Sequence, residues 1–414
     1  MARAVKQCRI CGNENLAEVL DLGVQALTGV FPKYREQRAT AGPLRLVKCI
    51  GKPDCCGLLQ LAHSYDHEEM YGANYGYRSG LNPSMIQHLH EKVRKILGLA
   101  DLSGDPIALD IGSNDGTTLR AYADARCRLV GIDPTAEKFR RYYPDKATII
   151  PHFFSARAFL DATRQRKARI VTSFSMFYDL EDPLGFMREV AEVLEDNGLW
   201  VFEQSYMPLM LERNSYDTVC HEHLEYYALS QLKWMSDRVG LRIVDIEFNE
   251  VNGGSFSVAA AKESSRFGEF AGLRKVLERE RQGRLDSLDP YREFAARAAA
   301  SREELRAFLA QAKARGQRVA GLGASTKGNV LLQYCGLSEQ DLYAIGEVNE
   351  DKFGSFTPGS LIPILPEKEL LADEPDFLLV LPWHFRDFFL RKYRLKKASL
   401  VFPLPTLEVV PPAA

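Results

Sequence analysis

The chain has 414 residues, of which 46% are apolar, 26% charged and 10% aromatic, a composition that excludes a disordered or fibrous protein and supplies more than one buried core. Its 53 Lys and Arg against 55 Asp and Glu leave a formal charge of -2, without the overall basic field that duplex nucleic acid binding normally requires. No stretch approaches about 18 consecutive apolar residues, and the start MARAVKQCRICG lacks the apolar core of a secretory signal. We therefore expect a cytoplasmic protein with no membrane span and no nucleic acid partner.

Cysteines are concentrated at the start of the chain. Cys8 and Cys11 form a Cys-x2-Cys knuckle, and Cys49 with either Cys55 or Cys56 supplies a second pair. Four thiolates form the usual shell of a closed structural zinc site, although the second pair is wider than the usual gap of about two to four residues. The pattern predicts a small zinc-binding module that contributes to folding and not to chemistry.

The middle of the chain alternates short apolar runs with helical stretches. A helical pattern at 84–98 precedes a breaker run at 100–106. The expected strands that follow are IALDI, LVGID, TII, RIVTSF and LWVFE, and EDPLGFMREVAEVLEDNG is expected to form a helix ending at Gly198. This alternation predicts a parallel, doubly wound sheet, to which LRIVDIEF and GGSFSVAAA add an antiparallel edge.

Residues 264–316 are rich in Arg, Glu, Ala and Leu and predict two amphipathic helices, the second starting near Pro290. The last block begins with the strand, Gly-rich turn and helix of QRVAGLGASTKGNVLLQYCG and ends with the strands DFLLVLP and SLVFPLP. It predicts a second, smaller α/β unit.

A first Gly-rich turn follows the strand IALD and supplies the candidate cofactor residues Asp110, Gly112, Ser113, Asn114 and Gly116. Asp133, at the end of the next strand, stands about twenty residues on, where an acid holds ribose hydroxyls. A dinucleotide site would need Gly-x-Gly-x-x-Gly, which is absent. The turn suits a ligand with an amino acid tail and no pyrophosphate, which points to S-adenosylmethionine (SAM).

A second group of reactive side chains is Cys220-His221-Glu222-His223-Leu224-Glu225-Tyr226-Tyr227. The two histidines lack the i, i+4 spacing of a zincin helix. Acid-base chemistry fits better, because a histidine can be half protonated near neutral pH and a carboxylate beside it can orient the ring.

The third group lies in the Gly-rich turn of the last block. A phosphate-binding NTPase loop needs Lys directly after its last Gly, and here Lys327 precedes Gly328, so that motif is excluded. Backbone amides at the helix start, with Ser325, Thr326 and Lys327, still form an anion cradle suited to a diphosphate. Glu350, Lys352 and Trp383 fall at the ends of expected strands, where they can contact a nucleotide.

The order of these parts resembles the sugar C-methyltransferases that act on nucleotide-linked 4-keto-6-deoxyhexoses, the family of the tetronitrose and kijanose C-3'-methyltransferases. The similarity covers nearly the whole chain and includes the segments YGYRSG, IGSNDG, CHEHLEYY, NGGSF, GASTKGN and TPG. It implies an α/β protein with a zinc-binding N-terminal domain (1–75), a class I (Rossmann-like) methyltransferase domain (76–263), and a helical connector with a C-terminal Rossmann-like domain that binds the nucleotide sugar (264–414).

The resemblance also implies site residues. It selects Cys8, Cys11, Cys49 and Cys56 as the zinc ligands, makes His223 the base with Glu222 as its orienting neighbour, and places Tyr75 and Tyr77 near the methionyl end of SAM. This chain has Cys220 where the family often has Tyr, and no His in 177–179, so those roles are not carried over. His221 or Tyr178 is left as the hydrogen-bond donor to an enolate.

The expected reaction is methyl transfer from SAM to C-3 of a nucleotide-diphosphate 4-keto-6-deoxyhexose, through an enolate formed by a base. The alternatives are an O- or N-methyltransferase on the same class of substrate, a zinc-ribbon RNA methyltransferase, and a non-catalytic nucleotide-sugar binding module. The RNA alternative predicts a basic, aromatic surface stripe, whereas Lys and Arg here are spread among acids. The sequence leaves the oligomeric state open, with a monomer as the simplest expectation.

Overall fold

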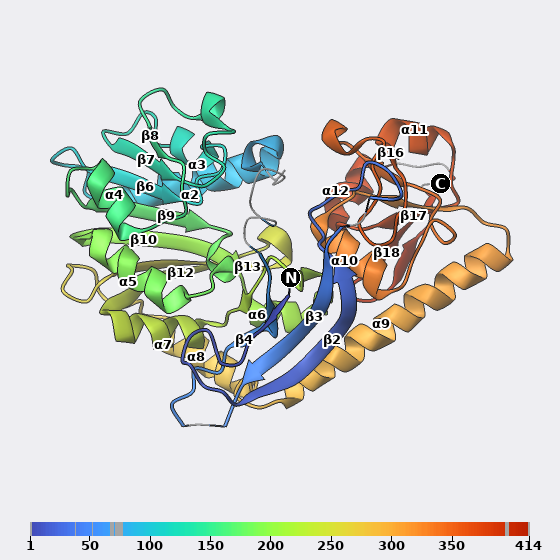
Figure 1. Cartoon of the computed structure of the whole chain (residues 1–414), viewed down its shortest axis with the longest axis horizontal. Coiled ribbons are helices and arrows are strands. Elements are labelled where there is room, and N and C mark those ends of the chain that lie inside the picture. Colours follow the sequence, from blue (N-terminus) through green and yellow to red (C-terminus); the bar gives the residue numbers. More distant parts are fainter. Residues whose placement is uncertain are drawn as a thin grey trace.

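The structure is a computed structural model that describes residues 2–37, 39–51, 53–66, 70, 78–393 and 397–412. Two α/β bodies stand on either side of a long N-terminal β-ribbon, and a long helix runs beneath the ribbon and the C-terminal body (Figure 1). This architecture confirms the predicted α/β class with an N-terminal cysteine module, a central methyltransferase-like body and a C-terminal Rossmann-like body.

The central body is built on a seven-stranded sheet in the order β12-β13-β10-β9-β6-β7-β8. The five parallel strands are β6 (Ile107–Ile111), β7 (Arg128–Ile132), β8 (Thr148–Ile150), β9 (Ala168–Phe174) and β10 (Leu194–Ser205). The predicted antiparallel edge is present as β12 (Leu241–Asn249) and β13 (Ser255–Lys262). All five residues of β6 are buried, which is why this strand reads as an unbroken apolar run with one acid.

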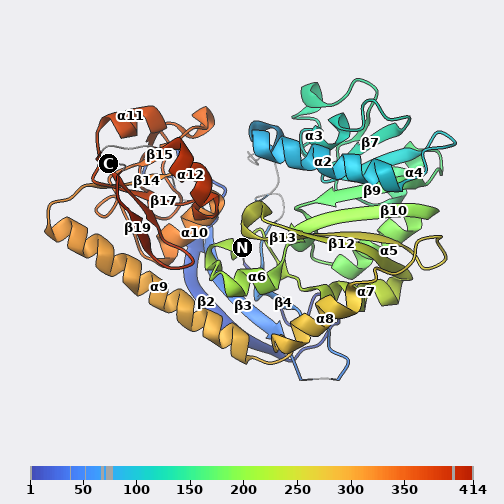
Figure 2. The same ribbon diagram turned by 180° about the vertical axis from the view of Figure 1, so that it is seen from behind.

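Helices cover both faces of this sheet (Figure 2). They are α2 (Pro83–Leu99), α3 (Thr117–Arg120), α4 (Ala156–Ala162), α5 (Pro183–Val193), α6 (Met207–Glu212) and α7 (Leu229–Val239). The expectation that the helix α5 continues to Gly198 is wrong. Leu194 is fully buried and pairs with Ala168 as the first residue of β10, because sheet pairing outweighs the helical propensity of the polar residues that follow.

The N-terminal module contains a four-stranded antiparallel sheet in the order β11-β4-β3-β2. Its strands are β2 (Leu16–Ala26), β3 (Ala41–Cys49), β4 (Leu59–Leu61) and β11 (Glu225–Tyr226), and a small pair joins β1 (Arg3–Ala4) to β5 (His63–Ser64). The strand β11 comes from the middle of the chain, directly after the histidine run. That pairing fixes the histidine run where the N-terminal module meets the central body.

The two predicted connector helices are α8 (Leu273–Gln282) and α9 (Asp289–Ala314), the second with Pro290 in its first turn. The C-terminal sheet has the order β16-β15-β14-β17-β18-β19 and is parallel except for its last strand. Its strands and helices are β14 (Val319–Leu322), α10 (Thr326–Tyr334), β15 (Ile345–Glu347), β16 (Ile364–Pro366), α11 (Glu367–Ala372), β17 (Phe377–Val380), α12 (Arg386–Lys392), β18 (Ser399–Phe402) and β19 (Glu408–Val410).

One apolar core is continuous through all three parts of the molecule. The ribbon of β2 and β3 helps to connect the three parts, because the loop after β2 is hydrogen-bonded to α10. In this contact, Asn329 Nδ2 donates to the Thr28 carbonyl at 2.8 Å. Within the described residues, no helix combines the length and apolarity that crossing a bilayer needs.

Candidate active site

Four cysteine sulfurs gather beneath the N-terminal sheet. The sulfurs of Cys8, Cys11, Cys49 and Cys56 all lie within 4.8 Å of one another, with 3.4 Å between Cys8 and Cys56 and 3.6 Å between Cys11 and Cys49. Four ligands at the Zn–S distance of about 2.3 Å form a tetrahedron with edges of about 3.8 Å, so the cluster fits a zinc ion. Of the two adjacent candidates, Cys56 and not Cys55 completes the set.

The first Gly-rich turn connects β6 to α3. Gly112 has φ +70° and a Cβ on it would lie 3.1 Å from Met176 Cγ, so the turn needs glycine there. The Asp133 carboxylate at the end of β7 accepts hydrogen bonds from Asn114 N at 2.9 Å and Thr135 N at 2.6 Å. Ser113 Oγ and the Tyr143 hydroxyl stand 2.8 Å apart behind the turn. The acid therefore ties the turn to the neighbouring strand while facing the cavity.

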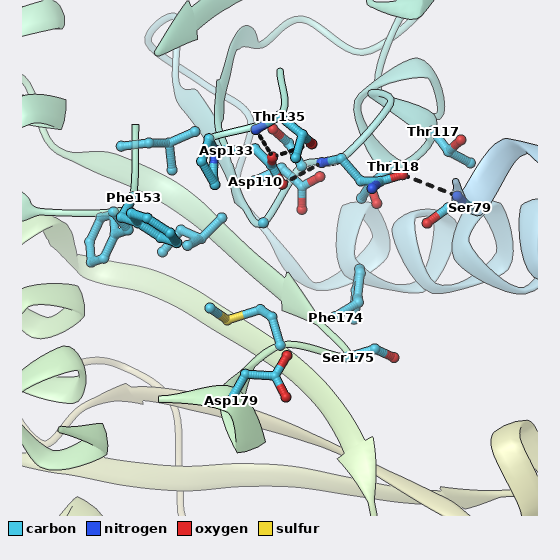
Figure 3. A pocket seen from close by; sticks show the side chains of 18 of the residues that line it. Ser79, Asp110, Thr117, Thr118, Asp133, Thr135, Phe153, Phe174, Ser175 and Asp179 are labelled. Carbon is cyan, nitrogen blue, oxygen red and sulfur yellow. Dashed lines mark hydrogen bonds between the residues drawn. The ribbon is translucent and has the colours of Figure 1, made fainter. Parts of the chain in front are cut away.

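A cavity of about 220 Å³ opens at this turn, at the carboxyl ends of the parallel strands. Figure 3 shows Asp110, Asp133 and Thr135 on one side of it and Ser175 and Asp179 on another, with Phe153 apart from both groups. The predicted residues Asp110, Gly112, Ser113, Asn114 and Asp133 all line the cavity, whereas Gly116 is the N-cap of α3 behind it. The combination of acids, a glycine turn and apolar walls fits a nucleoside with an amino acid tail.

Asp110 lies at the floor of the cavity. It is 2% exposed and accepts a hydrogen bond from Thr172 Oγ1 at 2.6 Å. Burial raises the pKa of this carboxyl to about 7. A positively charged amino group in the cavity would lower that pKa and hold Asp110 ionised. Tyr75 and Tyr77, the other predicted cofactor residues, lie outside the described residues.

We expect Asp133→Ala to weaken SAM binding about 30-fold. The substitution removes the observed brace on Asn114 and, in the binding mode expected from the sequence, a charged acceptor for the ribose hydroxyls, a loss of about 2 kcal/mol. Isothermal titration calorimetry measures the affinity, with the exposed Asp124→Ala as the matched control. Unchanged SAM affinity in Asp133→Ala would contradict the placement of the ribose.

His223 stands at the junction of the central body and the N-terminal sheet. Its Nδ1 lies 3.0 Å from the Thr218 carbonyl, and because a carbonyl only accepts, Nδ1 carries the proton. The neutral ring then leaves Nε2 as a lone-pair base. Burial lowers the pKa of His223 to about 4, with the charge of Lys327 acting in the same direction, so the ring is neutral at physiological pH.

The other two members of the histidine run have different surroundings. His221 is fully buried, with Nε2 3.4 Å from the Gly42 carbonyl and its ring packed edge-on against Tyr65. This position makes it part of the packing of the N-terminal module, so the expectation that it could face an enolate is wrong. The Glu222 carboxylate accepts from Thr28 Oγ1 at 3.3 Å, and burial raises its pKa. The contact that orients the His223 ring at Nδ1 comes from the Thr218 carbonyl.

A short 3-10 helix, η3 (Phe177–Asp179), separates His223 from the cofactor cavity. Asp179 lines the cavity, and the ring of its neighbour Tyr178 contacts the His223 ring with centroids 4.3 Å apart. The base candidate and the cofactor cavity thus lie on adjoining sides of one turn of backbone.

The second Gly-rich turn, in the C-terminal body, follows the same design as the first. Ser325 caps α10 by accepting from Gly328 N at 3.0 Å, and Ala324 N donates to Glu347 Oε2 at 2.9 Å. Thr326 is the first residue of α10. The expectation that Glu350 stands at the strand end is wrong by three residues, because β15 ends at Glu347 and Glu350 begins an exposed 3-10 turn. Glu347, the acid directly after the short apolar run Ala344-Ile345-Gly346, marks the strand end in the sequence, and this signal was missed.

The remaining predicted substrate residues, Lys352 and Trp383, each make a hydrogen bond within the protein. Lys352 Nζ donates to the Ala324 carbonyl at 2.8 Å and supports the turn from behind. Trp383 Nε1 donates to Asp217 Oδ2 at 2.8 Å and joins the C-terminal body to the central one. Asp217 had no signal in the sequence, since it lies in an irregular segment before the histidine run.

Three models of known protein families match successive parts of this chain. Residues 8–71 match a family model described as "Putative zinc binding domain", residues 85–246 a methyltransferase domain, and residues 250–405 the C-methyltransferase C-terminal domain. C-methyltransferase NovU of Streptomyces niveus is 30% identical over 417 residues, covering 99% of this chain and 98% of NovU.

The chain belongs to the NovU family of C-methyltransferases. It is a SAM-dependent C-methyltransferase, and its four-cysteine cluster is the zinc site of the family's N-terminal domain. The resemblance inferred from the sequence is confirmed.

Solved structures of lower similarity cover less than half of this chain. The CcbJ methyltransferase from Streptomyces caelestis is 14% identical with a TM-score of 0.34, over 42% of this chain and 89% of CcbJ. Mitomycin 7-O-methyltransferase MmcR is 16% identical with a TM-score of 0.34, over 44% of this chain and 55% of MmcR.

Proposed function

We propose that this C-methyltransferase transfers the methyl group of SAM to C-3 of a nucleotide-linked 4-keto-6-deoxyhexose. The observation that carries the proposal is the position of His223, a neutral, partly buried base next to the cofactor cavity and beside the segment on which α10 of the C-terminal body packs. Carbon methylation needs an activated carbon, and a ketone acidifies the carbon beside it, so a base of this kind suits a keto sugar.

In the proposed reaction, His223 Nε2 removes the C-3 proton while Thr218 holds the ring by Nδ1. The C-3–H electron pair moves into a C-3=C-4 bond and the C-4 carbonyl becomes an enolate. Bound SAM supplies an electrophilic methyl group, which C-3 takes as sulfur departs with the bonding pair. Tyr178 packs on the His223 ring and restricts its rotation.

The nucleotide part of the substrate is proposed to lie on the C-terminal body. Backbone amides at the start of α10, with Ser325 and Thr326, suit the diphosphate, because helix N-termini favour anions. Glu347 occupies the strand-end position that Asp133 has in the cofactor domain. We propose units of 1–75 for zinc, 76–263 for SAM and 264–414 for the connector and nucleotide sugar, which together form one active site.

The experiment that tests this function incubates the enzyme with thymidine- and guanosine-diphosphate 4-keto-6-deoxyhexoses in deuterated water, with SAM or with S-adenosylhomocysteine. We expect a methylene mass gain on one sugar with SAM, and deuterium at C-3 with S-adenosylhomocysteine. No mass gain on any sugar would contradict the substrate class. Deuteration at C-5, the other carbon beside the ketone, would move the methylation site.

A further inference from the structure

A cluster of buried and partly buried polar groups from four separate elements lies next to the turn that holds the base. Lys327 Nζ at the start of α10 donates to the Asn252 carbonyl at 2.5 Å, in the 3-10 turn η5 (Val251–Gly253). Asp217, in η4 (Tyr216–Thr218), accepts from Trp383 in η7 (Trp383–Phe385). A Cβ on Gly253 would lie 3.8 Å from Lys327 Nζ and 3.6 Å from His384 Cβ, so these elements are in contact.

Two atoms of this cluster are buried without a hydrogen-bond partner among the described residues. They are Asp217 Oδ1 and His384 Nδ1. Asp217 is fully buried, and of the three N–H groups of Lys327 one is used by Asn252. Buried polar atoms are normally paired, so two unpaired atoms on elements that contact the Lys327 turn point to a polar group of a bound ligand as their partner.

The cluster is tied directly to the catalytic histidine. Asp217 precedes Thr218, whose carbonyl holds His223 Nδ1, so one short turn positions both the base and the carboxylate facing Lys327. The positive charge of Lys327 contributes to the lowered pKa of both His223 and His384, as it must if the ammonium is near each ring. Lys327 lies in the first turn of α10, and α10 packs on η4, so the cation lies close to the turn that holds the base.

We propose that the Lys327 ammonium donates a hydrogen bond to the substrate oxygen at C-4 and stabilises the enolate. This assignment rests on the proposed function and names the donor that it requires. As the C-3–H bond breaks, its proton goes to His223 Nε2 and its electron pair forms the C-3=C-4 bond, which places negative charge on the oxygen beside Lys327. When C-3 takes the methyl group and sulfur leaves with its pair, the C-4 carbonyl forms again.

Lys327 fits this role better than the other candidates. Burial lowers the pKa of its amine, which makes its N–H a stronger hydrogen-bond donor, and a cation stabilises an oxyanion more than a neutral hydroxyl does. Of the two donors that the sequence left open, His221 is held in the packing of the N-terminal module, and Tyr178, whose ring packs on His223, offers only a neutral hydroxyl. The diphosphate can be served by the backbone and hydroxyl donors at the start of α10.

The test compares Lys327→Met and Lys327→Arg with the wild type. It measures C-3 deuterium exchange with saturating thymidine- or guanosine-diphosphate 4-keto-6-deoxyhexose and S-adenosylhomocysteine, and the equilibrium affinity for the same sugar. We expect Lys327→Met to slow exchange and kcat about 100- to 1,000-fold, as for a lost oxyanion donor, with affinity changed less than about fivefold, and Lys327→Arg to recover part of the rate. Lys397→Met, at an exposed lysine just before the amino end of β18, is the control for the same chemical change.

The opposite result separates the two hypotheses. If Lys327→Met exchanges at the wild-type rate once saturated and only its affinity for the sugar falls, Lys327 binds the diphosphate and the enolate role is wrong. If the wild type itself neither exchanges nor methylates any sugar of the panel, the proposed function fails instead. If Lys327→Met does not fold, Lys327→Arg is compared with Lys327→Gln, which has no charge. Equal exchange rates and equal sugar affinities in these two variants would contradict the role of the lysine charge.

Discussion

His223→Asn is expected to lower kcat about 100- to 10,000-fold while leaving the affinities for SAM and sugar near their wild-type values. Asparagine keeps a side-chain N–H that can reach the Thr218 carbonyl, so the fold of the run is preserved, but it has no basic nitrogen. Steady-state kinetics and calorimetry measure the two effects. The exposed His152→Asn is the matched control.

The pH dependence of the wild type follows from the same residue. A base acts only when unprotonated, and the pKa of His223 is lowered to about 4 by burial. With SAM saturating, so that Asp110 is held ionised, kcat/KM for the sugar should therefore be constant from about pH 5.5 to neutrality and fall as the pH drops through about 4, where folding permits. An acid limb near the ordinary histidine pKa of about 6.5, or full turnover by His223→Asn, would contradict the assignment of the base.

Cys56→Ser is expected to abolish stoichiometric zinc binding and most of the stability of the N-terminal module. A structural zinc site contributes on the order of 10 kcal/mol to folding, and three thiolates bind the ion far less tightly than four. Because β4 pairs with β11 directly after His223, the loss should spread to the base. Metal content by mass spectrometry and thermal unfolding measure both effects.

The neighbouring cysteine supplies the control. Cys55→Ser makes the same chemical change one residue away, and Cys55 is not among the four sulfurs that lie within 4.8 Å of one another. We expect it to keep one zinc per chain and an unchanged melting temperature. Zinc loss from Cys55→Ser and not from Cys56→Ser would overturn the ligand set.

The central sheet could be predicted from the sequence because its strands are buried on both faces. β6 is fully buried and β9 nearly so, so each appears as a short apolar run between polar helices. The start of β10 could not be predicted in this way. Its residues Glu195 to Gly198 are polar, and they join the sheet only through the pairing of Leu194 with Ala168, which is a tertiary contact.

The candidate site was predictable only where local pattern decides position. Asp133 follows a clear strand, so its place at the cavity could be anticipated, although its role as a brace for the turn was not. β15 has only three residues and gave no register for Glu347. The orienting contact of His223 comes from the Thr218 backbone, which no side-chain pattern reveals. Asp217 and Lys327 are 110 residues apart in sequence, and only the packing of α10 on η4 brings them together.

The most direct test of carbon methylation is the NMR spectrum of the product made from methyl-labelled ¹³C-SAM and a uniformly ¹³C-labelled nucleotide 4-keto-6-deoxyhexose. The account predicts a one-bond carbon–carbon coupling between the new methyl group and C-3. A methyl signal without that coupling, at the chemical shift of an O- or N-methyl group, would contradict the enolate mechanism and the role of His223 in it.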